Sequence, residues 1–118
     1  MRNNKRPLTG DFSEYLVGRM KSDPGLRRER LTGAVEAIVN GQVDDAKLAL
    51  RDYVKATIGF EALGQAIGKK SESVKRMLSP TGNPTLANLV LILECLKAEE
   101  GVTFAVEAAE PDSDLVPA

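Results

Sequence analysis

Apolar residues recur at intervals of three and four along the first half of the chain, which is the spacing of an α-helix buried on one face. The pattern predicts three helices, over residues 11–21, 24–40 and 44–58. Asp23 and Pro24 are a typical N-cap and first helical residue for the second of them. We interpret the three apolar faces as the sides that pack into a core.

Two shorter helices are expected next, over 60–67 and 71–79. Gly68 separates them, because glycine adopts the positive φ of a tight turn at little cost, and Ser71 is the expected N-cap of the second helix. The run SPTGNP then predicts a loop, since its prolines and its glycine oppose a continuing helix.

The last predicted helix covers 86–97, begins after an N-cap Thr85 and is apolar on two sides. A helix that is apolar nearly all round must be covered on both sides, and in a chain this short a neighbouring subunit is one source of the second cover. In residues 102–106, the larger apolar side chains Val102, Phe104 and Val106 alternate with Thr103 and Ala105, and this period of two indicates a strand. Because no other segment has this pattern, we expect the strand to pair with a strand of another chain.

These elements predict an all-α domain with one short C-terminal strand. Residues 1–10 are expected to form a flexible arm, residues 11–106 a single helical domain, and residues 107–118 a disordered acidic tail. A length of 118 residues fits one domain with a modest core.

The formal charge of the whole chain is −1, so no overall basicity indicates nucleic acid. Residues 60–79 nevertheless have a net charge of +2, whereas residues 107–118 hold only acidic charges. The chain has no histidine, which is the commonest general base and metal ligand, and its single cysteine allows no internal disulfide. No apolar run approaches the roughly 20 residues that span a bilayer. We therefore expect a cytoplasmic protein that is not an enzyme, uses no metal or cofactor and does not contact a membrane.

Residues 60–79 also contain what a helix-turn-helix unit requires. Two helices that cross closely need a small residue at their contact, which Gly64 supplies, while Gly68 opens the turn. The second helix would then present a polar outer side, and such a helix enters the major groove of DNA with its N-terminal residues at base edges. The apolar residues expected to hold the pair against the core are Phe60, Leu63, Ile67, Val74 and Met77.

The candidate DNA-binding residues lie on this outer side, in the turn before it and in the loop after it. Lysine and arginine donate to guanine edges or phosphates, serine donates to either, and glutamate accepts from cytosine. Lys69 takes a position that is usually apolar, so we expect it to face a phosphate, and we expect the loop around Asn83 to add backbone contacts. The full set is Lys69, Lys70, Ser71, Glu72, Ser73, Lys75, Arg76 and Asn83.

Two further features allow more than one interpretation. Cys95 lies in an apolar stripe, where a buried small hydrophobic side chain is more common than a reactive thiol. Arg27, Arg28 and Arg30 form a basic cluster, which is either solvated or in contact with a phosphate or a partner.

The stretch GFEALGQAIGKKSESVKRMLSPTGNPTLANLVLILECL resembles the helix-turn-helix antidote proteins of bacterial toxin–antitoxin addiction modules. These proteins have a phage-repressor (Cro-type) DNA-binding fold and commonly join a loop of the form LSP-GNP to the recognition helix. The resemblance covers roughly residues 44–106, with the loop matched from Leu78 to Pro84. It implies a dimer that binds an operator, commonly its own, and neutralises a toxin of the RelE/ParE-like class. The DNA-reading role that it implies falls on Lys70, Ser71, Glu72, Lys75 and Arg76.

The fold expected from the resemblance is a helix-turn-helix bundle of the phage-repressor-like type with additional N-terminal helices. The expected function is that of a sequence-specific DNA-binding transcriptional regulator, the antitoxin and autorepressor of a toxin–antitoxin module. It would act on a double-stranded DNA operator as a homodimer, joined through the last helix and the C-terminal strand. The alternative is a protein-interaction module that masks a toxin or another partner without binding DNA.

Overall fold

A computed structural model of the chain describes residues 8–111, with side chains from residue 12 onward. This part of the chain consists of α-helices and includes no strand, which confirms the all-α class. The N-terminal elements are α1 (Leu8–Met20), α2 (Pro24–Val39) and α3 (Val43–Ala56). They are followed by α4 (Phe60–Ile67), α5 (Ser71–Met77) and α6 (Leu86–Glu100).

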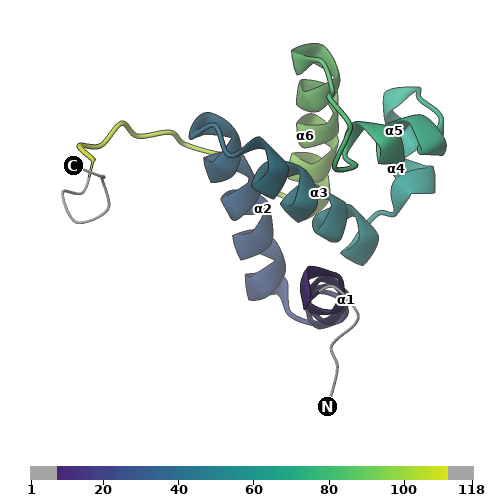
Figure 1. Cartoon of the computed structure of the whole chain (residues 1–118), viewed down its shortest axis with the longest axis horizontal. Helices are drawn as coiled ribbons and strands as arrows, with labels where there is room; N and C mark the ends of the chain where they lie inside the picture. Colours follow the sequence, from purple (N-terminus) through teal and green to yellow (C-terminus); the bar gives the residue numbers. More distant parts are fainter. Residues whose placement is uncertain (1–7, 112–118) are drawn as a thin grey trace.

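The six helices divide into two neighbouring groups. Helix α1 packs across α2 and α3, while α4 packs on α5, α6 and the end of α3 (Figure 1). In Figure 1, α4 and α5 form one edge of the molecule, and the segment that follows α6 runs out past α2 on the other side. One apolar core joins α2 to α6, with aliphatic side chains around a fully buried Tyr53. Its other fully buried members are Leu31, Ala34, Leu50, Val54, Leu63, Val74, Leu78, Ile92 and Leu96.

Most helix boundaries follow from short-range hydrogen bonds that the sequence indicates. The Asp23 carboxylate accepts from the Leu26 amide at 3.1 Å, and the Thr85 hydroxyl accepts from the Asn88 amide at 3.1 Å. Helix α6 ends at Gly101, which adopts the left-handed φ of 73° and allows its amide to bond back to the helix. The predicted N-caps of α2 and α6 are therefore confirmed.

Several predicted helix boundaries differ from those of the structure. Helix α1 begins at Leu8, so residues 8–10 of the predicted arm are helical, and α6 runs to Glu100, three residues beyond its predicted end. Helix α5 has Lys70 as its N-cap residue and no side-chain cap, because Lys70 has the extended backbone that ends the turn. Ser71 is already helical, and its hydroxyl lies 3.4 Å from a Glu72 carboxylate oxygen. The rest of the predicted arm and most of the predicted tail lie outside the described residues.

The predicted C-terminal strand is not present in the described chain. After Gly101 the backbone has no regular hydrogen bonding, and a strand needs a partner that residues 8–111 do not offer. The alternation of residue types has another cause, since Val102 and Phe104 pack against the core while Val106 is 76% exposed. No helix within residues 8–111 has the length and apolar character to cross a membrane.

Candidate nucleic-acid interface

Helices α4 and α5 cross so closely that only a glycine fits at their contact. A Cβ atom on Gly64 would lie 2.6 Å from the backbone oxygen of Lys69. The turn between the helices is fixed by Gly68, with a φ of 72°, and by the Lys69 amide, which donates to the Gly64 oxygen at 2.8 Å. The two helices and the turn, residues 60–77, are called the α4–α5 unit below.

The inner side of the α4–α5 unit is locked into the core. Leu63, Val74 and Leu78 are fully buried, and Phe60 and Met77 pack against the same cluster. Because the helix period places Val74 and Leu78 on one face, the opposite face of α5 must point outward. Glu72, Lys75 and Arg76 are exposed on that outer side.

The candidate residues predicted from the sequence lie on or beside this outward face. Ser71 and Ser73 are half-buried, while the others are exposed. The four cations make no ion pair with a side chain that the structure describes. Asn83 is exposed in the loop that follows α5. The exposed members are Lys69, Lys70, Glu72, Lys75, Arg76 and Asn83.

The loop after α5 is folded tightly back onto the end of that helix. A Cβ atom on Gly82 would lie 1.9 Å from the Arg76 oxygen and 2.5 Å from the Met77 oxygen. The Gly82 amide also donates to the Ser79 oxygen at 2.9 Å. A side chain at position 82 is therefore incompatible with this path, and the loop holds Asn83 close to the C-terminal end of α5.

Two cations of α3 support this loop, although no sequence motif marks them. Lys47, which is 6% exposed, donates to the Pro80 oxygen at 3.1 Å and the Gly82 oxygen at 2.7 Å. Arg51 donates to the Leu78 oxygen at the end of α5. A buried ammonium group needs such partners. The sequence marks Lys47 only as a lysine on the apolar face of a helix. It does not identify the acceptors, because these are backbone oxygens far along the chain.

The arginine cluster of α2 belongs mainly to the interior of the fold. Arg27 Nε lies 3.1 Å from Glu100 Oε1, and the Tyr53 hydroxyl donates to the same oxygen. Burial raises the pKa of the Tyr53 hydroxyl, and the hydrogen bond and charge of Glu100 raise it further. Arg30 pairs with the buried Asp52 at 2.7 Å. Arg28, whose side chain is 61% exposed, also faces Glu100 at 3.8 Å.

Cys95 is partly buried and packs against the core, as its apolar stripe predicts. Burial raises the pKa of its thiol, and the negative charge of Glu99 acts in the same direction. A raised pKa leaves the group as a thiol at neutral pH, where it packs as a small apolar side chain.

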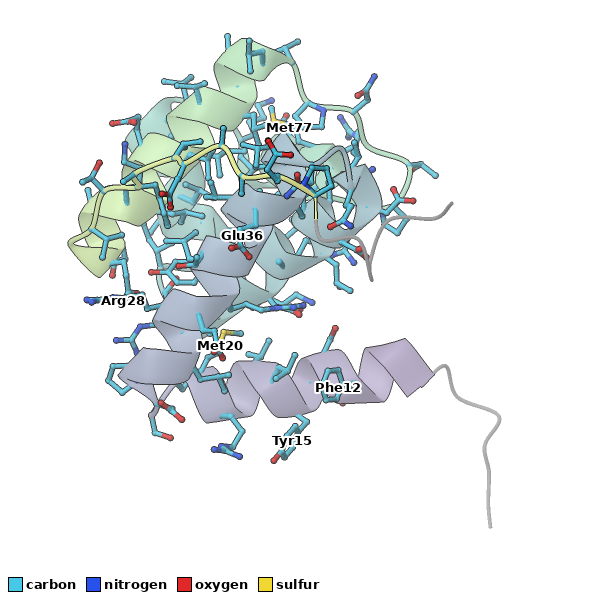
Figure 2. The ribbon with its side chains drawn as sticks, turned by 90° about the vertical axis from the view of Figure 1, so that its left-hand side faces the viewer. Phe12, Tyr15, Met20, Arg28, Glu36 and Met77 are labelled. Carbon is cyan, nitrogen blue, oxygen red and sulfur yellow. The ribbon has the colours of Figure 1, made fainter. Side chains whose placement is uncertain are left out.

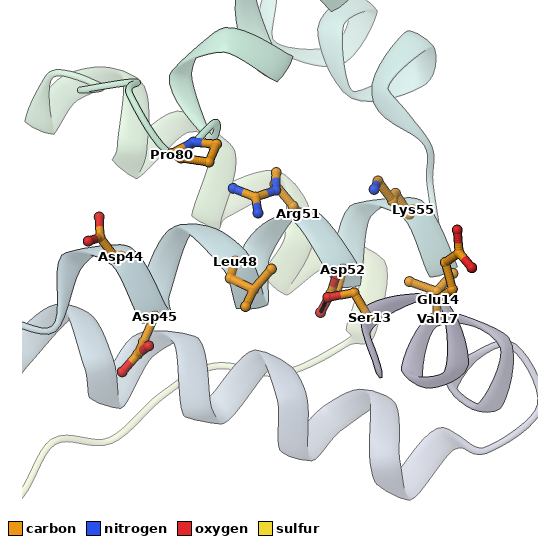
Figure 3. Close-up of a pocket in the computed structure, with 10 residues that line it drawn as sticks. All are labelled: Ser13, Glu14, Val17, Asp44, Asp45, Leu48, Arg51, Asp52, Lys55 and Pro80. Atoms are coloured by element: carbon orange, nitrogen blue, oxygen red, sulfur yellow. Dashed lines mark hydrogen bonds between the residues drawn. The ribbon is translucent and has the colours of Figure 1, made fainter. Parts of the chain in front are cut away.

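A concave surface lies along α3, between α1 and the loop after α5 (Figure 3). It has a volume of about 750 Å³, and α3 forms its floor, with α1 at one end and Pro80 above. Val17 and Leu48 contribute apolar surface, and the nearly buried Asp52 accepts from Ser13 at 3.4 Å. This surface is called the α1–α3 groove below.

No family model, curated protein or solved structure matches the chain.

Proposed function

We propose that the chain is a sequence-specific regulator that binds double-stranded DNA, with α4–α5 as a helix-turn-helix unit and α5 as its recognition helix. The observation that carries the proposal is the crossing at Gly64, which buries Val74 and turns the opposite side of α5 outward. That outward side presents Lys75 and Arg76, and Lys70 lies at its N-terminal end. A short, exposed helix of this kind fits the major groove.

The proposed contacts divide into two classes. Residues of α5 would reach base edges, where lysine and arginine donate to guanine and Glu72 accepts from cytosine. Lys69 in the turn and Asn83 in the loop flank the helix, so they would contact the phosphate backbone and set its register. The net +2 of residues 60–79 favours this surface over the rest of a chain whose charge is −1.

We also propose that two copies act together through α6. Leu86 is 77% exposed, and Val90 and Leu91 are 46% and 43% exposed, so the first half of this helix has an uncovered apolar side. The proposed dimer has a two-fold axis along this side and presents its two copies of α5 to one face of the duplex. Half-sites about 34 Å apart, one turn of DNA, would then be read together.

The resemblance to antidote proteins extends the proposal to an autorepressor and antitoxin that acts in the cytoplasm and binds a toxin of the RelE/ParE-like class. The alternative, a module that masks a partner without binding DNA, has one observation in its favour. On α1, the rings of Phe12 and Tyr15 stack at 6.4 Å and are both more than half exposed, and Arg19 donates to the Tyr15 hydroxyl. Figure 2 shows Tyr15 pointing away from the body of the molecule. Exposed aromatic and arginine side chains are typical of protein interfaces.

The test begins with selection of binding sequences from a random duplex pool by the full chain, followed by gel-shift titration. Lys75→Ala with Arg76→Ala should weaken binding to the selected sequence by roughly tenfold or more, because each such contact contributes about 1–3 kcal/mol. The matched control removes two cations elsewhere, Lys21→Ala with Arg28→Ala. Equal affinities for the wild type and the α5 double variant would reject the assignment of α5. Failure to select any sequence would favour the masking module.

A further inference from the structure

The α1–α3 groove differs from the DNA-reading surface in shape and in charge. Its apolar surface comes from Val17 of α1, Leu48 of α3 and Pro80 of the loop after α5. A volume of about 750 Å³ is enough for several side chains of a partner. Figure 3 shows these residues around one hollow, with Leu48 near its middle.

The charges around the groove are predominantly acidic. Four carboxylates and two cations line it, but one carboxylate, Asp52, is buried and paired with Arg30, so three carboxylates against two cations leave an accessible charge of −1. Asp44 has a side chain that is 91% exposed, and Glu14 and Asp45 are also exposed, so these carboxylates are accessible to an occupant. One of the two cations, Arg51, donates to the neutral Leu78 oxygen and keeps its charge, while the other, Lys55, is exposed. The surface therefore has the opposite sign to residues 60–79.

This combination selects one class of occupant. Carboxylates at the rim repel phosphate, so neither nucleic acid nor an anionic membrane fits the groove. An occupant must be basic to match the rim and must also carry an apolar side chain for the surface around Leu48. The exposed aromatic side of α1, by contrast, carries no charge pattern that would select a class of partner.

We propose that the α1–α3 groove docks a basic segment of a partner protein, which places an apolar side chain between Val17 and Leu48. This inference deepens the proposed antitoxin role, on which its biological meaning rests, because it gives the partner a site and a chemistry. No residue of α5 lines the groove, and the peptide and the DNA are titrated separately, so that each surface is measured without the other ligand.

The probe is a short peptide with lysine and leucine at helical spacing, titrated into the ¹⁵N-labelled full chain. Two comparison peptides replace leucine by serine or lysine by glutamate. The lysine–leucine peptide should shift the amide signals of Ser13, Val17 and Leu48 and bind about tenfold more tightly than the lysine–serine peptide, since burying one leucine is worth that much. Equal binding of the two basic peptides, or shifts confined to other surfaces, would overturn the proposal.

A matched pair of variants then locates the site. Asp45→Lys with Leu48→Ser reverses a charge and removes an apolar side chain three residues later. The affinity for the lysine–leucine peptide should fall by about tenfold or more. Glu36→Lys with Val39→Ser makes the same change on an exposed part of α2 and should leave the affinity unchanged. Asp45→Lys with Glu14→Lys keeps Leu48 and serves if the first variant does not fold. Equal effects of the groove and control variants would reject the groove.

Gel-shift titration of the same variants separates this inference from the proposed function. A groove variant that no longer binds the peptide but still binds the selected DNA sequence supports both proposals. A wild-type chain that binds the peptide at the groove but selects no DNA contradicts the regulator and leaves the docking site standing. A wild-type chain that binds DNA but shows no shifts in the groove contradicts the docking site alone.

Discussion

The two halves of the molecule are held together by different means. In the α4–α5 unit and the loop after it, the backbone segments approach until no side chain fits at Gly64 or Gly82. Around α2, α3 and the end of α6, charged side chains link distant segments, as where Glu100 meets Arg27 and Tyr53. Both halves share one apolar core, but the first also requires glycine at two close backbone contacts, whereas the second also uses buried carboxylates paired with arginine.

The difference affects how each half responds to substitution. A close backbone approach tolerates no added atom, because the atoms in the way belong to the main chain and cannot rotate aside. An ion pair between half-buried groups tolerates partial replacement, since water reaches the exposed partner. The largest effects of substitution are therefore expected at the close backbone contacts of Gly64 and Gly82.

The strongest challenge to this comparison is Gly82→Ala. The added methyl would lie 1.9 Å from the Arg76 oxygen, so the loop must move, and the free energy of unfolding should fall by about 3 kcal/mol. Gly33→Ala is the control, because no atom lies within 4 Å of its Cβ position in α2, and it should raise stability by up to about 1 kcal/mol. Denaturant titration measures both, and similar effects of the two would show that the close approach is unimportant.

Glu100→Gln addresses the charged half. The Glu100 side chain is 4% exposed, but its partners Arg27 and Arg28 reach solvent, so we expect a loss of about 2 kcal/mol rather than the larger cost of a fully buried pair. The control Glu94→Gln removes an exposed pair with Lys97 and should change stability by less than about 0.5 kcal/mol. A loss below that of the control would mean that Glu100 does not hold the helices together.

Lys47→Met tests the point where the two halves meet. It keeps the buried stem but removes two hydrogen bonds to the loop, which should cost about 1.5 kcal/mol in unfolding free energy. Because the loop positions Asn83 and the end of α5, the affinity for the selected DNA sequence should also fall. Lys21→Met, at an exposed position, is the control for both measurements. Unchanged DNA affinity with lowered stability would limit Lys47 to a folding role.

The smallest expected effect is a loss of folding stability just above pH 10. The raised pKa of Tyr53 means that the folded state keeps its phenol proton after the unfolded chain has lost it. Stability should therefore be fully present below pH 10, the ordinary pKa of tyrosine, and fall by about 1 kcal/mol per pH unit above it. Tyr53→Phe should remove this slope, and Tyr15→Phe, at an exposed ring, should keep it. Equal slopes in the wild type and Tyr53→Phe would contradict the assignment.

Features that depend on neighbouring residues could be predicted from the sequence. The apolar spacing gave all six helices, and the small residue at 64 with the turn glycine at 68 gave the crossing of α4 and α5. Ser71 was assigned as a cap because its residue type is common there, whereas the backbone of the turn gives that position to Lys70. The DNA-reading role of α5 stays a prediction.

Features that depend on distant residues could not be predicted. The partners of Lys47 and Arg51 are carbonyl oxygens 27 to 35 residues away, and every residue type offers a carbonyl, so no pattern marks them. The groove is equally hidden, because Val17, Leu48 and Pro80 come from separate elements. In the period-two pattern at 102–106, Val102 and Phe104 pack against the core while Val106 is exposed, and alternation alone does not distinguish this packing from a strand.

Arg51 connects the α1–α3 groove to the end of α5. Its guanidinium lines the α1–α3 groove and also holds the Leu78 oxygen at the end of α5. An occupant that drew Arg51 away would remove this hydrogen bond from the end of α5, so occupancy of one surface would alter the binding constant of the other. Thermodynamic linkage requires that effect to be reciprocal. A single shared guanidinium would then be enough to make the response to two ligands cooperative or antagonistic.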